Sequence, residues 1–144
     1  MHIYVDADAC PVKDEAIRVA ERVGARVTLV SAQGMRPRRE AHVDQVVAGD
    51  KFDAADDWIA ERIQPGDLCV TNDVPLASRC VEKGAKAISP TGRIFDAQSV
   101  GHALAMRNLG QHLREANQKQ TYNAPFGPKD RSRFLLAMDR SVAR

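Results

Sequence analysis

Residues 2–8 read His-Ile-Tyr-Val-Asp-Ala-Asp, a short apolar run that stops at two closely spaced carboxylates. A run of this kind, rich in β-branched and aromatic residues, is typical of a buried strand. Pro11 follows at the position where a helix begins, and Gly24 closes that helix. The opening of the chain therefore predicts a strand followed by a helix, which is the first unit of a parallel α/β sheet.

The same alternation continues along the chain. Further strands are expected over residues 26–30, 42–47, 67–71 and 86–89, with helices over 53–63, 75–83, 99–118 and from Asp130 onward. This order predicts a mostly parallel central sheet of about five strands, with helices on both faces. The 144 residues then form a single three-layer α/β domain, with C-terminal helices from about residue 99 packed on it.

Composition narrows the class of protein. Hydrophobic residues make up 44% of the chain and charged residues 28%, which is ordinary for a soluble globular domain. No apolar run approaches the roughly 20 residues that a membrane span needs, and no secretory signal is expected at the N-terminus. The three cysteines show no C-x-x-C pairing, which argues against a disulfide framework or a structural zinc site and predicts a cytoplasmic setting.

The charges are distributed unevenly. Residues 1–100 carry 13 basic and 16 acidic side chains, a net charge of −3, whereas residues 101–144 carry 8 and 3, a net charge of +5. An acidic body with a basic C-terminal part suits a metal site beside an anion-binding surface. Simple solvation of exposed helix faces explains the basic part equally well.

Carboxylates follow two of the predicted strands at the point where each strand ends. Asp6 and Asp8 come after the first strand, and residues 71–73, Thr-Asn-Asp, come after the fourth. In an open parallel sheet the functional crevice lies outside the carboxyl ends of the strands. If these two strands are neighbours, Asp6, Asp8 and Asp73 converge there.

The helix predicted from Asp53 adds further acids at the same edge. Asp53, Asp56 and Asp57 share one helix face by their spacing. Taken singly, Asp8, Asp53 and Asp73 are explained by helix capping, but Asp6 directly follows an apolar strand and is costly there without a partner.

Clustered carboxylates repel one another unless a cation neutralises them. Oxygen ligands favour Mg²⁺ or Mn²⁺ over zinc, and such sites usually act on phosphate oxygens. We therefore expect the aspartates at this edge to bind a divalent cation. The residues that could hold a phosphate-containing substrate are the following: Ser31, Thr71, Asn72, Arg107 and Arg131.

Several segments also resemble the uncharacterised bacterial YaiI/YqxD family, also called UPF0178. The resemblance rests on residues 3–13, Ile-Tyr-Val-Asp-Ala-Asp-Ala-Cys-Pro-Val-Lys, and covers nearly the whole chain. The other matching segments are residues 53–59, 66–67, 71–77 and 130–134.

In a wider sense the chain is similar to PIN-like nucleases. Those place one Asp after the first strand, an acid in a mid-chain helix, and a Thr-Asn-Asp turn after the fourth strand. The resemblance implies that Asp6, Asp56 and Asp73 hold the metal and are catalytic, with Asp53 as an additional metal ligand and Asp8 as an additional catalytic carboxylate. It also implies a PIN-like fold and a Mg²⁺- or Mn²⁺-dependent cleavage of phosphodiesters, most simply in RNA.

Two other functions remain open. The first is a phosphatase of the haloacid-dehalogenase type, with Asp6 as nucleophile and Asp8 as acid and base. That motif carries Thr or Val two residues beyond the second Asp, whereas Cys10 stands there. The second is a metal- or nucleic-acid-binding protein without catalysis. The sequence also leaves the oligomeric state open, with a homodimer as one option.

Overall fold

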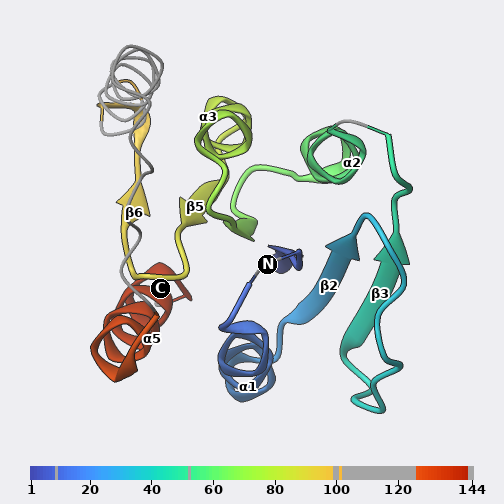
Figure 1. The fold of residues 1–144 in the computed structure, drawn as a ribbon. Helices are drawn as coiled ribbons and strands as arrows, with labels where there is room; N and C mark the ends of the chain where they lie inside the picture. The colour runs from blue at the N-terminus through green and yellow to red at the C-terminus, as the bar shows by residue number, and fades with distance from the viewer. Residues whose placement is uncertain (9, 52, 99–100, 102–125, 143–144) are drawn as a thin grey trace, which may run out of the picture.

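The chain forms a six-stranded sheet with the strand order β3-β2-β1-β4-β5-β6 (Figure 1). A computed structural model describes residues 1–8, 10–51, 53–98, 101 and 126–142. The strands are β1 (His2–Asp6), β2 (Arg26–Ser31), β3 (Val43–Val47), β4 (Leu68–Val70), β5 (Lys86–Ile88) and β6 (Ile94–Phe95). The first five are parallel, and β6 pairs antiparallel with β5. The mostly parallel α/β sheet is confirmed, and β6 adds a strand to the five expected.

Helices cover both faces of this sheet, as predicted. On one face lie α1 (Lys13–Val23) and α5 (Pro128–Val142), and on the other lie α2 (Ala54–Arg62) and α3 (Val74–Glu82), as Figure 1 shows. The helix expected over 99–118 lies outside the described residues, apart from Gly101. Within the described ranges, no helix is both long and apolar enough to cross a membrane.

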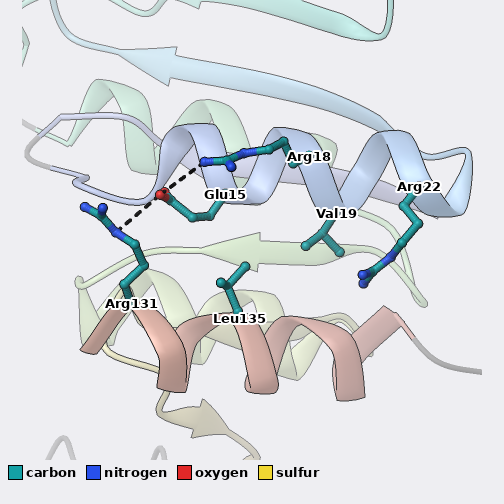
Figure 2. A pocket seen from close by; sticks show the side chains of 6 residues that line it. All are labelled: Glu15, Arg18, Val19, Arg22, Arg131 and Leu135. Carbon is teal, nitrogen blue, oxygen red and sulfur yellow. Dashed lines mark ion pairs between the residues drawn. The ribbon is translucent and has the colours of Figure 1, made fainter. Parts of the chain in front are cut away.

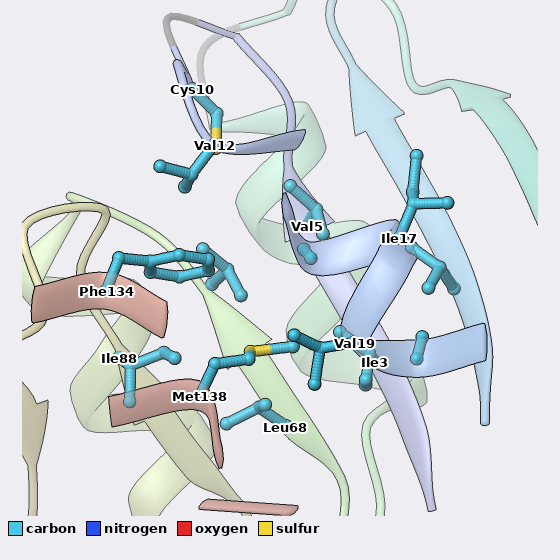
Figure 3. Packing of buried hydrophobic residues seen from close by; sticks show 14 of the residues in the cluster. Ile3, Val5, Cys10, Val12, Ile17, Val19, Leu68, Ile88, Phe134 and Met138 are labelled. Carbon is cyan, nitrogen blue, oxygen red and sulfur yellow. The ribbon is translucent and has the colours of Figure 1, made fainter. Parts of the chain in front are cut away.

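The central strand β1 supplies side chains to both layers of the core. Ile3 and Val5 belong to the apolar cluster under α1 and α5, whereas Tyr4 belongs to the cluster under α2 and α3. Phe134 and Met138 of α5 are fully buried against the first face (Figure 3). Successive side chains of β1 point to opposite faces of the sheet, and both faces are buried under helices. The sheet is therefore the middle layer of three.

The two central strands also define where a site can form. After β1 the chain continues into α1 on one face, and after β4 it continues into α3 on the other face. Their carboxyl ends therefore lie at the point where the connections diverge, which is the usual place for a binding crevice in an open α/β sheet.

Candidate metal and phosphate site

Asp6 ends β1 directly beside the end of β4. Val5 is paired with Val70 in the parallel register, so Asp6 and Thr71 emerge side by side. The Thr71 hydroxyl donates a hydrogen bond of 3.0 Å to Oδ2 of Asp6. Thr71 itself is buried, and its hydroxyl oxygen accepts the backbone N–H of Asp73 at 2.9 Å. Thr71 thereby orients Asp6, rather than presenting a free hydroxyl to solvent.

Asp73 begins α3 as its N-cap. Its Oδ1 accepts the backbone N–H of Leu76 at 2.9 Å, which satisfies one of the free donors in the first turn of the helix. One oxygen of Asp73 is thus held by the helix end. Asp73 is therefore a helix cap, as its position suggested. Its negative charge also raises the pKa of Asp6 and of Asp56.

Asp56 lies in the first turn of α2 and is half-buried. Burial raises the pKa of Asp56 to about 7, and the charges of Asp73, Asp6 and Asp53 add to the shift. A hydrogen bond between Asp56 and Asp73 also raises this pKa, because the protonated Asp56 is the donor. Asp56, at the start of α2, therefore lies close to Asp73 and Asp6, at the edge where β1 and β4 end.

Asp6 responds to the same neighbours. The pKa of Asp6 is raised to about 6: burial is the largest cause, the hydrogen bond from Thr71 opposes it, and the charges of Asp73 and Asp8 add to it. A carboxyl with so high a pKa carries a negative charge that its surroundings do not compensate. Asp6 and Asp56 together mark the centre of an acidic cluster at the carboxyl edge of the sheet.

Asp8 and Asp53 lie at the exposed margin of this cluster. Oδ2 of Asp8 accepts the backbone N–H of Ala32 at 2.8 Å, which ties the exit of β1 to the exit of β2. Asp53 precedes α2 with a positive φ of 61° and makes no side-chain cap hydrogen bond. Its side chain is therefore not committed to the helix end.

Asp57 does not join the cluster, although its spacing suggested a shared face with Asp53 and Asp56. It forms an ion pair of 2.7 Å with Arg79 of α3 on the exposed surface. None of the ion pairs between described residues involves Asp6, Asp8, Asp53, Asp56 or Asp73.

The cluster suits a hard divalent cation by its chemistry, since its donors are carboxylate oxygens and its charge is uncompensated. The arrangement is not a finished coordination shell. In the part of the chain that the structure describes, no three His, Cys, Asp or Glu side chains already surround one point as metal ligands. Oδ2 of Asp6 is engaged by Thr71 and Oδ1 of Asp73 by the N–H of Leu76. Asp73 also shares a proton with Asp56, and a cation would replace that proton.

The residues expected to bind substrate occupy different positions. Asn72 is exposed between Thr71 and Asp73 at the cluster, whereas Ser31 is buried and its hydroxyl donates to the carbonyl of Gln33. Arg131 lies on α5, where its guanidinium group pairs with Glu15 at 3.3 Å. Arg107 lies outside the described residues.

Sequence reasoning overlooked Glu15, which is buried in the first turn of α1. A signal was present: Glu15 stands three residues after Val12 and four before Val19, on the buried stripe of the helix. Cys10, between β1 and α1, is also buried, and burial raises the pKa of its thiol.

Residues 4–144 match the family described as "Uncharacterized BCR, YaiI/YqxD family". A UPF0178 protein of Agrobacterium fabrum is 56% identical over 142 residues, which are 99% of this chain and 93% of that protein. A UPF0178 protein of Rhizobium etli is 58% identical over 142 residues, covering 99% of this chain and 92% of the relative.

A further UPF0178 protein, from Rhizobium meliloti, is 55% identical over 142 residues and is covered to 97% of its length. No solved structure matches the chain. The relatives thus extend over the acidic cluster and over both helical layers, but their names assign no chemistry.

Proposed function

We propose that this chain, which belongs to the YaiI/YqxD (UPF0178) family, is a PIN-like nuclease that uses Mg²⁺ or Mn²⁺ to hydrolyse RNA. One observation carries the proposal: Asp6 and Asp73 meet at the ends of β1 and β4, joined through the hydroxyl of Thr71. Burial and neighbouring acids raise the pKa of Asp6 to about 6 and that of Asp56 to about 7, which agrees with a crowded acidic site. Buried like charges at the carboxyl edge of a parallel sheet are costly to keep for structure alone. A divalent cation would offset that cost.

In this proposal Asp6, Asp56 and Asp73 hold the cation, and Asp8 and Asp53 add negative charge at the exposed margin of the acidic cluster. When bound, such a cation supplies activation of a water molecule and neutralisation of charge on the phosphodiester. Thr71 fixes the orientation of Asp6 through its hydrogen bond of 3.0 Å. Asp56 must lose its proton before it can act as a ligand, so cation binding strengthens as the pH rises toward 7.

Hydrolysis then proceeds by addition of a water oxygen to phosphorus and breakage of the bond to one of the two ester oxygens. The water gives up a proton, and the departing oxygen takes one. Asn72, exposed at the cluster, is placed to donate a hydrogen bond from its side-chain amide to a phosphate oxygen. Basic side chains of the C-terminal part would hold the strand by its phosphates.

The test is cleavage of a labelled single-stranded RNA by the purified chain with Mn²⁺, compared with an Asp6→Asn/Asp73→Asn double variant. We expect the double variant to lose at least about a hundredfold in rate, because a ligand set is removed. Asp44→Asn is the matched control, since Asp44 lies on β3 and pairs with Arg26 away from the cluster. Equal cleavage by the wild type and the double variant would contradict the proposal.

The same preparations separate the alternatives. Turnover of a small phosphate monoester with a trapped acyl-phosphate on Asp6 would favour the haloacid-dehalogenase type of phosphatase. Tight binding of RNA without turnover at any metal would favour a binding protein. Nothing in the geometry of Asp8, whose Oδ2 is held by the N–H of Ala32, favours the phosphatase over the nuclease.

A further inference from the structure

A second polar feature lies on the opposite side of the sheet from α2, in the cleft between α1 and α5 (Figure 2). The two helices run in the same direction, because Glu15 pairs with Arg131 near their starts and Arg22 pairs with Asp139 near their ends. The cleft has a volume of about 520 Å³, and its lining residues are Glu15, Arg18, Val19, Arg22, Arg131 and Leu135. That volume suits a ligand of nucleotide size.

Glu15 is the unusual residue of this cleft. It is 6% exposed, and its Oε1 lies 3.5 Å from Nη2 of Arg18 and 3.3 Å from Nε of Arg131. Its second oxygen, Oε2, is buried and has no hydrogen-bond partner among the described residues. A buried acceptor without a donor costs about 1–3 kcal/mol, so the missing donor needs an explanation.

The two arginines that flank Glu15 hold it only loosely. Both distances exceed the roughly 2.7–2.9 Å of a strong charge-assisted hydrogen bond. The side chains of Arg18 and Arg131 are 72% and 51% exposed, and Nε of Arg18 also donates to the carbonyl of Asp14. The cleft therefore carries two largely exposed basic side chains beside an acceptor that lacks a partner.

One end of the cleft lies toward the acidic cluster. α1 starts at the carboxyl edge of the sheet, and Glu15 is in its first turn. Glu15 and the Arg131 that pairs with it therefore lie toward the same edge of the sheet as Asp6.

A ligand that satisfies both groups must carry an anion with a hydroxyl or amino donor close to it. A ribonucleotide unit has this combination, because its 2′-hydroxyl is next to the 3′-phosphate, whereas DNA lacks the hydroxyl. We propose that the α1–α5 cleft is a subsite for RNA in which Arg18 and Arg131 bind a phosphate and Oε2 of Glu15 accepts a hydrogen bond from the 2′-hydroxyl. Both arginines contact Oε1 of Glu15, so they can stay beside the carboxylate while their remaining N–H groups bind the phosphate.

The choice of RNA rests on the proposed function, but the subsite itself needs no cleavage. Its test is therefore a binding measurement with EDTA present, using the full chain and three labelled strands of one sequence: RNA, DNA and 2′-O-methyl RNA. The wild type should bind RNA about tenfold more tightly than either strand without a 2′ donor, as expected for one hydrogen bond to a charged group.

Two variants assign the effect to residues. Glu15→Met keeps the bulk of the side chain but removes the acceptor, so the preference for RNA should fall to less than about twofold. Arg18→Ala/Arg131→Ala should weaken all three strands alike, because phosphates are common to them. Arg26→Ala is the matched control, since Arg26 pairs with Asp44 away from this cleft.

The outcomes are distinguishable from those of the nuclease test. Equal affinity of the wild type for RNA and its 2′-O-methyl form overturns the subsite, and this comparison needs no variant to fold. An RNA preference that survives Glu15→Met, or no binding of any strand, overturns it as well. Discrimination by 2′-hydroxyl without cleavage in Mn²⁺ leaves the subsite intact and removes only the nuclease.

Discussion

The hydroxyl of Thr71 donates to the carboxylate of Asp6 across the junction of β4 and β1, at 3.0 Å. Because the same hydroxyl oxygen accepts the N–H of Asp73 at 2.9 Å, its single proton is directed at Asp6. A buried residue with no access to a ligand thus controls both the orientation and the acidity of the central carboxylate.

Replacement of Thr71 by Val tests this control. Thr71→Val keeps the shape but removes the hydrogen bond that lowers the pKa of Asp6, so that pKa should rise further above its present value of about 6. Thr71→Ser should stay close to the wild type. Carboxyl titration by NMR checks this, and a pKa for Asp6 that is unchanged in Thr71→Val would contradict the assigned role. The free energy of unfolding should also fall by about 1 kcal/mol, measured in urea.

The raised pKa values make stability depend on pH. The folded chain holds the protons of Asp6 and Asp56 up to about pH 6 and 7, whereas an ordinary Asp releases its proton near 3.8. Protonation is therefore favoured more in the folded state, and this contribution to the free energy of unfolding is lost as the pH rises from about 4 to about 7.

Asp56→Asn isolates that contribution. Without divalent ions, the fall in unfolding free energy between pH 5 and pH 8 should be smaller in Asp56→Asn than in the wild type. We expect a difference of about 1 kcal/mol, because solvent screens the half-buried Asp56. Asp57→Asn is the control, since Asp57 is exposed and paired with Arg79. Urea unfolding at the two pH values measures the effect, and equal slopes for the wild type and Asp56→Asn would count against it.

Cation binding should raise thermal stability in a pH-dependent way. Mn²⁺ is expected to increase the melting temperature at pH 8 but much less at pH 5, where Asp6 and Asp56 keep their protons. At a concentration one hundred times its Kd, the ion would add about 2.7 kcal/mol. Differential scanning calorimetry with and without Mn²⁺ checks this, and Asp6→Asn/Asp56→Asn should abolish the increase. A shift of the same size in that variant would place the ion elsewhere.

Gly92 is expected to be intolerant of substitution. It has a φ of +93°, and a Cβ there would lie 2.6 Å from both the carbonyl carbon and the oxygen of Arg133. Gly92→Ala should therefore lower the free energy of unfolding by about 3 kcal/mol or more, from backbone strain and overlap together.

Two other glycines separate these causes. Gly49 has a φ of +104° but an open position for Cβ, so Gly49→Ala measures strain alone. Gly34 has open space and no positive φ, so Gly34→Ala should be nearly neutral. Urea unfolding of the three variants gives the comparison. A loss for Gly92→Ala no larger than for Gly49→Ala would show that the turn can move away from α5.

The strands were predictable because each of β1, β2, β4 and β5 is a short buried run with apolar residues on both sides. Strand β6 was not, since Ile94–Phe95 has too few residues for a pattern and depends on pairing with β5. The parallel arrangement also predicted that Asp6 and Asp73 would lie at the same edge of the sheet. Their meeting there depended on β1 and β4 being neighbours, which the sequence left as a condition and the structure shows.

Sequence patterns and chain order could not predict contacts between side chains on different helices and strands. The ion pair of Asp57 with Arg79 depends on how α2 packs beside α3. The spacing of Asp57 in the sequence suggested instead that it would face the acidic cluster with Asp53 and Asp56. The burial of Glu15 depends on α5, whose residues lie more than one hundred positions later in the chain. Periodicity within one helix cannot reveal a partner that another element supplies.

The packing of α5 has a consequence for synthesis of the chain on the ribosome. Phe134 and Met138 pack beside α1 over Ile3 and Val5, so this face of β1 stays only partly covered until α5 is made. A nascent chain that stops before Pro128 therefore lacks a closed core, however complete its sheet. The first strand to leave the ribosome thus waits for the last described helix before its core is complete, and local folding of β1 and α1 alone cannot give a stable domain.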